Sequence, residues 1–580
     1  MYTSSELLTR WPTLDVGTRH EQLRASLQLS SAAVDPRIDD DAARAARALW
    51  QRDASAWSSD TATQAEIADR LGWLTSPALM ASSLSRLQTF AESIRNDGFT
   101  DVVLLGMGGS SLAPEVMRSV FGRQPGWPAL HMIDSTDPAS VRAITCDPSR
   151  TLYILASKSG TTIEPNSLAA HFRGALERAG VGRWGNHFIA ITDDGTELAA
   201  RAEREQFRDA FINPSDIGGR YSAVSFFGLV PAALIGLDVA AIAGWALAML
   251  AWAEPRGERA ADNPAAALAL AIGSGMKAGR DKLTLVLSPE LEAFGLWVEQ
   301  LVAESTGKQG LGVVPIAGEP LGDPAVYGHD RVFVALRTGG DERATSQLER
   351  LQSAGHPVVD IRLAERAALG AEFLRWEIAT AIAGALLRIN PFDQPNVQQA
   401  KDATGKLLNA YKSSSRLPST KLDRTTSSGI ELTLSAPARD ELGRLGPEAF
   451  ITLVKPGLYF ALLAYLGPDA RLLEVMTGLR TRVRDTTAAA TMFGYGPRYL
   501  HSTGQLHKGG ANNGVFLIVT ATPDADVEIP GEPYSFGTLE LAQALGDFAS
   551  LEAAGRRALH VHLPAPDAKY LREMSALLLR

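Results

Sequence analysis

The segment Ser157–Thr162 (SKSGTT) places five side-chain hydrogen-bond donors around one glycine. It follows the apolar run Thr151–Ala156, which predicts a buried strand. Hydroxyl, ammonium and backbone N–H groups at the end of a parallel strand can hold the oxygens of a phosphate. Ser/Thr-rich loops are usually solvated turns, but this position after a strand favours a phosphate site.

A second turn, Gly106–Val116 (GMGGSSLAPEV), follows the predicted strand Asp101–Leu105. Gly108 and Gly109 let the backbone come close to a ligand, and Ser110 adds a hydroxyl. The pattern G-x-G-x-x-S is a poor dinucleotide fingerprint. Two interpretations therefore stay open, a phosphate-binding turn and an ordinary turn between a strand and a helix.

Three further segments carry charged or amide side chains in unusual settings. In IGGRYS, Gly219 precedes Arg220 within an apolar stretch, where an arginine is costly unless it is paired. In ESTGK, Glu304 follows an apolar helix and precedes a glycine turn, which indicates a buried loop. Gln394 and Lys401 follow the ordered turn Asn390–Pro391. A structural ion pair is the alternative for Arg220, and a solvated helix face is the alternative for Glu304.

Alternation of short apolar runs with helical stretches predicts the elements that position these residues. Such alternation is typical of parallel sheets covered by helices on both faces. We expect an α/β protein with a helical N-terminal region (1–95), two doubly wound parallel-sheet domains (96–255 and 256–410), a linker (411–429) and a C-terminal α/β region (430–580). The strands are expected at Leu130–Asp134, His187–Thr192, Leu283–Ser288, Arg331–Leu336, Pro357–Leu363, Gly514–Ala521 and Arg557–Leu563.

Two long apolar runs could each form more than one kind of structure. Phe226–Ala253 is almost entirely apolar, but Pro231, Gly236 and Asp238 interrupt it, so we predict two buried helices rather than a membrane span. We also predict an apolar helix at Leu453–Leu466. The Gly-rich segment Gly494–Ala521 either closes over a site, forms a subunit contact or is an ordered surface loop.

Composition limits the function classes. The 580 residues include one cysteine, Cys146, so an intramolecular disulfide is excluded and a cytoplasmic, reducing location is expected. The net charge of −9 and the lack of a basic stripe argue against a nucleic-acid partner. No secretory signal opens the chain. The histidine pairs 501/507 and 560/562 have no cysteine or acidic cluster beside them, so we expect no metal site and no cofactor.

Taken in the order in which they occur along the chain, these five segments resemble the phosphoglucose isomerase family. The most specific matches are G-x-G-G-S, S-K-[ST]-x-T-T-x-E, G-G-R-x-S-x-x-S-x-x-G-L and E-S-x-G-K, within about residues 100–405. The resemblance implies two sugar isomerase (SIS) domains. The N-terminal stretch and residues 494–521 also look like isomerases that are fused to a transaldolase, although this chain has no transaldolase half.

The resemblance implies roles for individual residues. Glu304 matches the catalytic base, and Arg220 matches the arginine that stabilises the enediolate. Lys401 and His329 match ring-opening groups, although the residues around His329 depart from the family pattern and a strand-capping histidine is the alternative. Substrate-binding positions are Gly108, Gly109, Ser110, Ser157, Lys158, Ser159, Thr162, Gly219 and Gln394. In homodimeric relatives the histidine comes from the neighbouring subunit, which implies a homodimer here.

The implied activity is a metal-independent isomerisation of glucose 6-phosphate and fructose 6-phosphate, with ring opening and a cis-enediolate. The alternatives are an isomerase of mannose 6-phosphate or an aminosugar phosphate, and an SIS-type sugar-phosphate sensor without catalysis. An isomerase of aminosugar phosphates would normally carry a glutamine amidotransferase domain with an N-terminal cysteine nucleophile. Position 2 is Tyr2 and the one cysteine is Cys146, which argues against this alternative. Glu304 and Lys401 favour an enzyme over a sensor.

Overall fold

The computed structural model describes residues 3–418 and 421–579. The chain forms two compact units. The first unit contains the chain up to Ile133, Cys146–Thr306 and Arg331–Asp393, and the second contains Asp134–Thr145, Gly307–Asp330 and the chain from Gln394 onward. Both predicted doubly wound domains have their sheets in the first unit. The segment after Thr306 and the segment that carries Gln394 and Lys401 belong to the second unit, and the domain boundaries given above stay predictions.

The N-terminal part of the first unit is mostly helical, as expected. An antiparallel strand within it pairs with the second sheet of the same unit. Its elements are α1 (Ser4–Arg10), α2 (His20–Ala25), β1 (Leu27–Leu29), α3 (Asp39–Gln51), α4 (Thr61–Ala68) and α5 (Ser76–Asn96).

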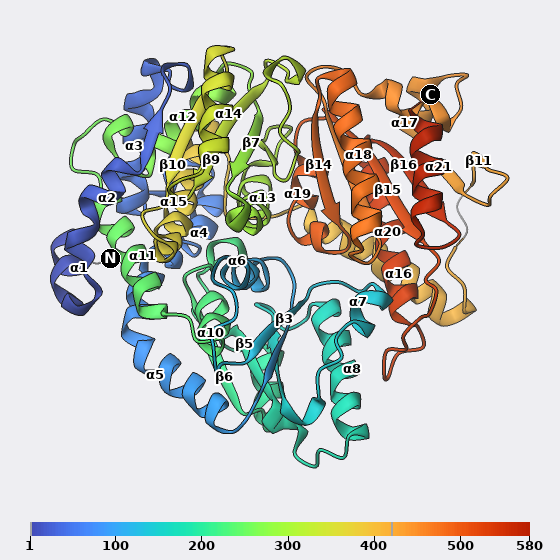
Figure 1. Cartoon of the computed structure of the whole chain (residues 1–580), viewed down its shortest axis with the longest axis horizontal. Helices are drawn as coiled ribbons and strands as arrows, with labels where there is room; N and C mark the ends of the chain where they lie inside the picture. The colour runs from blue at the N-terminus through green and yellow to red at the C-terminus, as the bar shows by residue number, and fades with distance from the viewer. Residues whose placement is uncertain (1–2, 419–420, 580) are drawn as a thin grey trace. The chain divides into compact units, whose positions relative to one another are not determined.

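The first sheet of this unit has five parallel strands in the order β3-β2-β4-β5-β6. Because helices cover both faces, its central strands are buried along their whole length. Its elements (Figure 1) are β2 (Asp101–Gly106), α6 (Leu112–Phe121), β3 (Ala129–Ile133), β4 (Thr151–Ala156), α8 (Ile163–Arg178), β5 (Phe188–Asp193), α9 (Glu197–Arg204), β6 (Asp209–Asn213), α10 (Phe226–Leu234) and α11 (Val239–Ala253).

In the second sheet, strands β1, β10, β9 and β7 lie side by side in that order, and all but β1 are parallel. Helix α13 packs against α6 and α15, so it connects the helical layers of the two halves of the first unit. The elements are α12 (Ala266–Lys277), β7 (Lys282–Leu287), α13 (Glu292–Thr306), β9 (Arg331–Arg337), α14 (Glu342–Ser353), β10 (Val358–Arg362) and α15 (Leu369–Leu387).

The second unit is built on a six-stranded sheet in the order β11-β12-β16-β15-β13-β14. Strands β16, β15, β13 and β14 are parallel, and helices α18 and α21 pack together with apolar residues of the sheet in one core. The elements are α7 (Pro138–Arg142), β8 (Val314–Ile316), α16 (Val397–Ser414), β11 (Arg424–Thr425), β12 (Glu431–Leu434), α17 (Ala436–Leu442), β13 (Tyr459–Tyr465), α18 (Ala470–Thr487), β14 (Ala490–Tyr495), α19 (Gly504–Gly509), β15 (Gly514–Ala521), α20 (Phe536–Ala553), β16 (Arg557–Leu563) and α21 (Ala568–Leu578).

The two apolar runs have different outcomes. Phe226–Ala253 forms two helices, α10 and α11, with Gly236 at φ +81° between them, as predicted. No helix in the described part of the chain has both the length and the apolar composition that a bilayer crossing needs. The helix predicted at Leu453–Leu466 is wrong, because Tyr459–Tyr465 is strand β13, which lies between β14 and β15. A strand buried on both faces lacks alternation and resembles an apolar helix in sequence.

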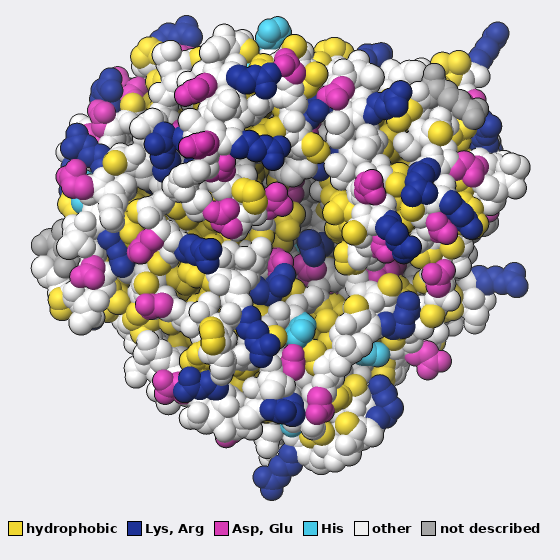
Figure 2. All heavy atoms as spheres, viewed as in Figure 1, with side chains coloured by type: hydrophobic (Ala, Val, Ile, Leu, Met, Phe, Trp, Pro, Cys, Tyr) yellow, Lys and Arg dark blue, Asp and Glu magenta, His cyan; other side chains and the backbone are white. Residues whose placement is uncertain are grey.

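On the face shown in Figure 2, basic and acidic side chains are interspersed rather than gathered into one stripe. This mixture agrees with the moderate net charge of −9. Any attraction for an anionic ligand must therefore come from a local arrangement of donors rather than from the field of the whole protein.

Candidate functional site

Two glycine-containing turns meet at the centre of the first unit. Strand β2 ends at Gly106, a short 3₁₀ turn covers Gly108–Ser110, and the second turn contains Gly219 and Arg220. A Cβ atom at Gly109 would lie 2.1 Å from the carbonyl oxygen of Gly219, so only glycine permits this approach. The two predicted motifs are thus packed backbone to backbone.

The Ser222 hydroxyl fixes this contact from the second turn. It donates to the carbonyl oxygen of Gly219 at 2.6 Å and lies 3.4 Å from that of Gly109. Ser110 is buried, and Gly108 has φ +55°, a backbone conformation that favours glycine. The turn that carries Ser110 is therefore held by the Arg220 turn, and not only by its own strand.

The Ser157–Thr162 loop follows β4, which is the direct neighbour of β2 in the sheet. The Ser157 and Thr162 hydroxyl oxygens lie 3.1 Å apart, and Ser157 also accepts from the Gly160 N–H at 3.1 Å. Thr162 is the N-cap residue of α8, yet its side chain makes no hydrogen bond to the N–H groups of that helix. The first turn of α8 thus has the N–H groups and the dipole that attract an anion.

Lys158 and Ser159 lie differently within this loop. The Lys158 ammonium pairs with the Asp193 carboxylate at the end of β5 and donates to the Ser215 carbonyl at 2.8 Å. Burial raises the pKa of Asp193, although Lys158 opposes that shift. Ser159 is exposed, and its hydroxyl oxygen lies 3.0 Å from that of Thr161. Lys158 therefore ties the loop to the neighbouring strand end.

Arg220 and Glu304 form the charged centre of the first unit. Both are buried, with exposed fractions of 3 % and 8 %. An Arg220 Nη1 atom lies 3.5 Å from Oε2 of Glu304, which is in the last turn of α13. Gln300, one turn earlier, donates to the same oxygen at 3.2 Å. The structure thus places the predicted base beside the predicted stabilising cation.

The remaining nitrogens of Arg220 are held by the protein. Nε donates to the Ser305 hydroxyl at 2.8 Å, and Nη2 donates to the carbonyl oxygens of Pro391 and Asp393 at 2.6 and 2.8 Å. The Tyr221 hydroxyl lies 3.3 Å from that of Ser305, and burial raises the pKa of Tyr221. Ser305 and Tyr221 were not among the predicted site residues, although each is adjacent to one that was.

The other three predicted residues lie in the second unit. Gln394 and Lys401 are exposed, and Lys401 is in the first turns of α16. His329 is exposed in the segment before β9. The structure therefore brings together Gly108, Gly109, Ser110, Gly219, Arg220 and Glu304 within the first unit, with the Ser157–Thr162 loop on the adjacent strand.

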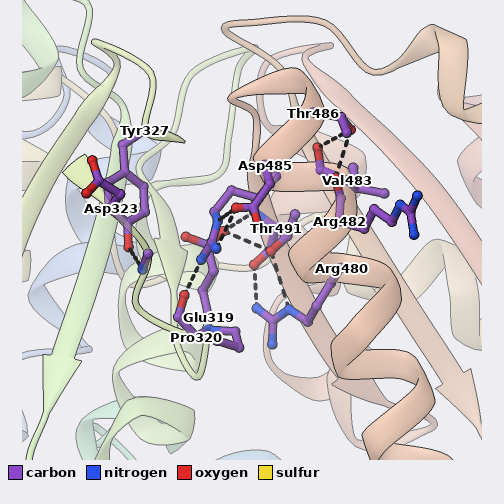
Figure 3. Close-up of polar contacts among 12 residues, drawn as sticks. Glu319, Pro320, Asp323, Tyr327, Arg480, Arg482, Val483, Asp485, Thr486 and Thr491 are labelled. Atoms are coloured by element: carbon purple, nitrogen blue, oxygen red, sulfur yellow. Dashed lines mark hydrogen bonds and ion pairs between the residues drawn. The ribbon is translucent and has the colours of Figure 1, made fainter. Parts of the chain in front are cut away.

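The second unit holds the segment that leads to His329 (Figure 3). Glu319 is buried and accepts hydrogen bonds from the Thr491 N–H and hydroxyl, both at 2.8 Å. Arg480 of α18 donates to the Gly318 carbonyl at 3.0 Å. The Gly322 N–H donates to the Tyr327 hydroxyl at 2.7 Å. The segment Gly318–Pro320 is thus held by hydrogen bonds to α18 and β14.

Among the described residues, one group of three side chains has ligand atoms close enough for a single metal ion: Asp101, His131 and Cys146. His131 Nε2 already lies 2.8 Å from Asp101 Oδ1, and burial together with Asp101 raises the pKa of the Cys146 thiol to about 11. A protonated thiol is a poor metal ligand. Asp101 opens β2, whereas Ser110 and Ser157 follow the other ends of their strands.

Comparison with known proteins gives consistent matches. A sequence model described as phosphoglucose isomerase matches residues 78–311. A protein named glucose-6-phosphate isomerase from Rubrobacter xylanophilus is 32 % identical over 368 residues, which are 54 % of this chain and 84 % of the relative. One of the same name from Citrifermentans bemidjiense is 29 % identical over 398 residues, or 58 % of this chain and 74 % of the relative. A solved structure, a hypothetical protein from Thermus thermophilus, superposes with a TM-score of 0.55 at 27 % identity and covers 66 % of this chain and 99 % of that one.

Proposed function

Since the chain belongs to the phosphoglucose isomerase family, we propose that Glu304 and Arg220 form the reactive end of its active site. The enzyme interconverts glucose 6-phosphate and fructose 6-phosphate. The observation that supports the assignment of residues is the buried contact of 3.5 Å between the Glu304 carboxylate and the Arg220 guanidinium.

Proton transfer between C2 and C1 is the step that requires these two residues. In the aldose-to-ketose direction, Glu304 takes the proton from C2, and the electron pair forms the double bond of a cis-enediolate. The same proton returns to C1, and the O2 proton is transferred to O1, so that O2 becomes the ketone oxygen and O1 becomes a hydroxyl. The developing negative charge needs a fixed positive partner, and we propose Arg220 for it, because its other nitrogens are already bound.

The phosphate would bind at the Ser157–Thr162 loop and the Ser110 turn. Both follow neighbouring parallel strands, and the first turn of α8 directs N–H groups toward an anion. Gly108, Gly109 and Gly219 would let the backbone approach the substrate, and Lys158 and Ser159 would complete the phosphate contacts. Holding this non-reacting end orients C1 and C2 for proton transfer.

Ring opening needs an acid and a base at O1 and the ring oxygen. We propose His329 and Lys401 for these roles and Gln394 as a substrate contact, on the basis of their matches to the family pattern. We also propose a homodimer, since the matching histidine of homodimeric relatives comes from the neighbouring subunit. A cytoplasmic location is proposed because the chain has a single cysteine. Sedimentation of the purified protein at twice the 61.9 kDa of one chain would support the dimer, and a stable active monomer would contradict it.

A coupled assay tests the residue assignment. Fructose 6-phosphate is supplied, and formation of glucose 6-phosphate is followed with a dehydrogenase for wild type and Glu304→Gln. We expect the variant to lose about two to four decades in kcat with little change in KM, given the usual contribution of a general base. Glu299→Gln, a buried carboxylate on the same helix, is the matched control. Turnover near the wild-type rate in Glu304→Gln would remove Glu304 from the role of base.

A further inference from the structure

Gln505 makes an unusual set of hydrogen bonds in the Gly-rich segment before β15. It lies in α19 and is completely buried. Its amide nitrogen donates to the Gly307 carbonyl at 2.9 Å and to the Asn396 side-chain oxygen at 2.8 Å. Its amide oxygen accepts from the Asn396 backbone N–H at 2.8 Å. Both N–H groups and the carbonyl oxygen of this side chain are thus used.

The two partners of Gln505 belong to segments that the proposed reaction uses. Gly307 comes three residues after Glu304 in the chain. Asn396 is the N-cap residue of α16, two residues after Gln394 and five before Lys401. One amide side chain therefore joins the end of the Glu-Ser-Thr-Gly-Lys motif to the start of the helix that carries Lys401.

Gly509 shows how closely these three groups are packed. A Cβ atom at position 509 would lie 2.4 Å from the Asn396 side-chain oxygen, 2.5 Å from the Gln505 nitrogen and 2.8 Å from the Gly307 carbonyl oxygen. The Gly509 carbonyl also accepts from the Gly310 N–H at 3.0 Å. We name the set Gly307, Asn396, Gln505 and Gly509 the glutamine joint.

Buried charges hold α19 in place. Lys508 donates to Asp547 at 2.6 Å, and both side chains are almost completely buried. The Tyr499 hydroxyl donates to the other oxygen of Asp547 at 2.7 Å. Asp547 lies in α20, which packs against α16. Helix α19, which carries Gln505, is therefore bound to α20, and α20 also packs against α16, the helix of Lys401.

We propose that Gln505 is a positioning residue of the isomerase, which sets the separation between the Gly307 turn and the start of α16 and so the placement of Gln394 and Lys401. This inference rests on the proposed function. In this proposal the C-terminal region has a role in the site, because it keeps the Gly307 turn and the start of α16 at a fixed spacing. Gln505 itself does not need to touch the substrate.

Gln505→Glu tests the joint with little change in size. The carboxylate keeps the acceptor for the Asn396 N–H but sets an oxygen against two carbonyl oxygens, which costs free energy. We expect kcat for fructose 6-phosphate to fall at least about tenfold at pH 8, while KM changes less than about threefold. At lower pH the buried carboxyl takes a proton and can donate one hydrogen bond again, so the loss relative to wild type should shrink. The control Gln543→Glu places a carboxylate at another buried glutamine of the second unit and should keep kcat within threefold.

A second pair of variants tests the joint without a charge. Gly509→Ala inserts a methyl group between the three partners, whereas Gly504→Ala on the same short helix meets no atom closer than 3.4 Å. We expect the first to lower kcat as Gln505→Glu does and the second to leave it unchanged. If Gln505→Glu fails to fold by circular dichroism, this pair decides the question.

Coupling to Lys401 separates positioning from general stability. In a Lys401→Met background, we expect Gln505→Glu to lower kcat by less than about a further threefold, because the group that Gln505 positions is already absent. The proposal would be overturned if Gln505→Glu lowered kcat as much in the Lys401→Met background as in wild type. It would also be overturned if the controls Gln543→Glu and Gly504→Ala lost as much kcat as the joint variants. A kcat within threefold of wild type for both Gln505→Glu and Gly509→Ala would contradict it as well. An inactive wild-type enzyme would instead contradict the proposed function.

Discussion

Arg220 and Ser305 are joined by a hydrogen bond of 2.8 Å from the arginine Nε to the serine hydroxyl, one residue beyond Glu304. Because Ser305 is in the same helical turn as Glu304, this bond ties the orientation of the guanidinium to the helix that carries the carboxylate. Two backbone carbonyls accept hydrogen bonds from Nη2 as well, so the protein itself fixes the position of the cation. A charge fixed in advance does not need to reorganise during the reaction.

Arg220→Lys should lower kcat by about 10²–10³-fold, the usual effect of losing one fixed electrostatic donor in an active site. An ammonium is a compact charge, and it cannot bind Ser305, two carbonyls and Glu304 in the planar arrangement of a guanidinium. The coupled assay measures this loss, with Arg201→Lys as a control that keeps a separate ion pair with Glu205. A variant with wild-type turnover would show that only the charge matters at this position.

Gly109→Ala should destabilise the fold and weaken substrate binding together. The new methyl group would lie 2.1 Å from the Gly219 carbonyl oxygen, so the two turns must separate. We expect a loss of about 1–3 kcal/mol in the free energy of unfolding, as for other overpacked sites, and a rise in KM for fructose 6-phosphate. Urea unfolding and the coupled assay measure the two effects. Gly182→Ala, where the space is open, is the control, and unchanged KM in Gly109→Ala would contradict a role of this turn in binding.

Acid should destabilise the second unit through His560. Burial lowers the pKa of this histidine to about 3, and its Nε2 lies 2.8 Å from the Thr520 hydroxyl oxygen. The unfolded chain, with a pKa near 6.5, binds the proton more readily, so the stability contribution is complete above about pH 6.5 and is lost as the pH falls toward 3. Between pH 7 and pH 5 we expect a loss of about 2 kcal/mol in the free energy of unfolding from this residue.

Urea unfolding of wild type and His560→Gln at both pH values checks this expectation. Burial lowers the pKa of His507 and His562 as well, so part of the acid sensitivity should persist in the variant. An equal loss in wild type and His560→Gln would show that His560 does not titrate in this range.

Treatment with a chelator should leave isomerase activity unchanged. In the proposed reaction, Arg220 supplies the positive charge beside Glu304, so the proton transfer needs no metal ion. Activity is measured after incubation with EDTA and dialysis. Loss of activity that Zn²⁺ restores would contradict the metal-independent scheme.

The sequence predicted the elements whose signals are local. The two helices of Phe226–Ala253 are separated by Gly236, and the Asp238 side chain caps the second helix by accepting from the Ala241 N–H at 2.9 Å. Each signal lies within a few residues of its effect. Strand β13 has no such signal, since its burial between two parallel neighbours depends on the rest of the sheet.

The same distinction applies to the site. Glu304 and Arg220 were predicted from motifs that surround them, and the structure places them 3.5 Å apart. Gln505 was not predicted, because its partners are 109 and 198 residues away in the chain. Nothing in a glutamine within a Gly-rich segment indicates which distant backbone groups it will bind. Only the folded chain brings these groups together.

Strand β1 has a consequence for solubility. Its three residues pair with β10, and Ser30 continues the contact. The Ser30 N–H donates to the Val358 carbonyl at 2.9 Å, and the Ser30 hydroxyl oxygen accepts from the Val358 N–H at 2.9 Å. Without this pairing, β10 would expose a row of free N–H and C=O groups, which can recruit strands from other molecules. The N-terminal segment thus protects the sheet edge against aggregation, and a truncation beyond Ser30 would leave that edge open.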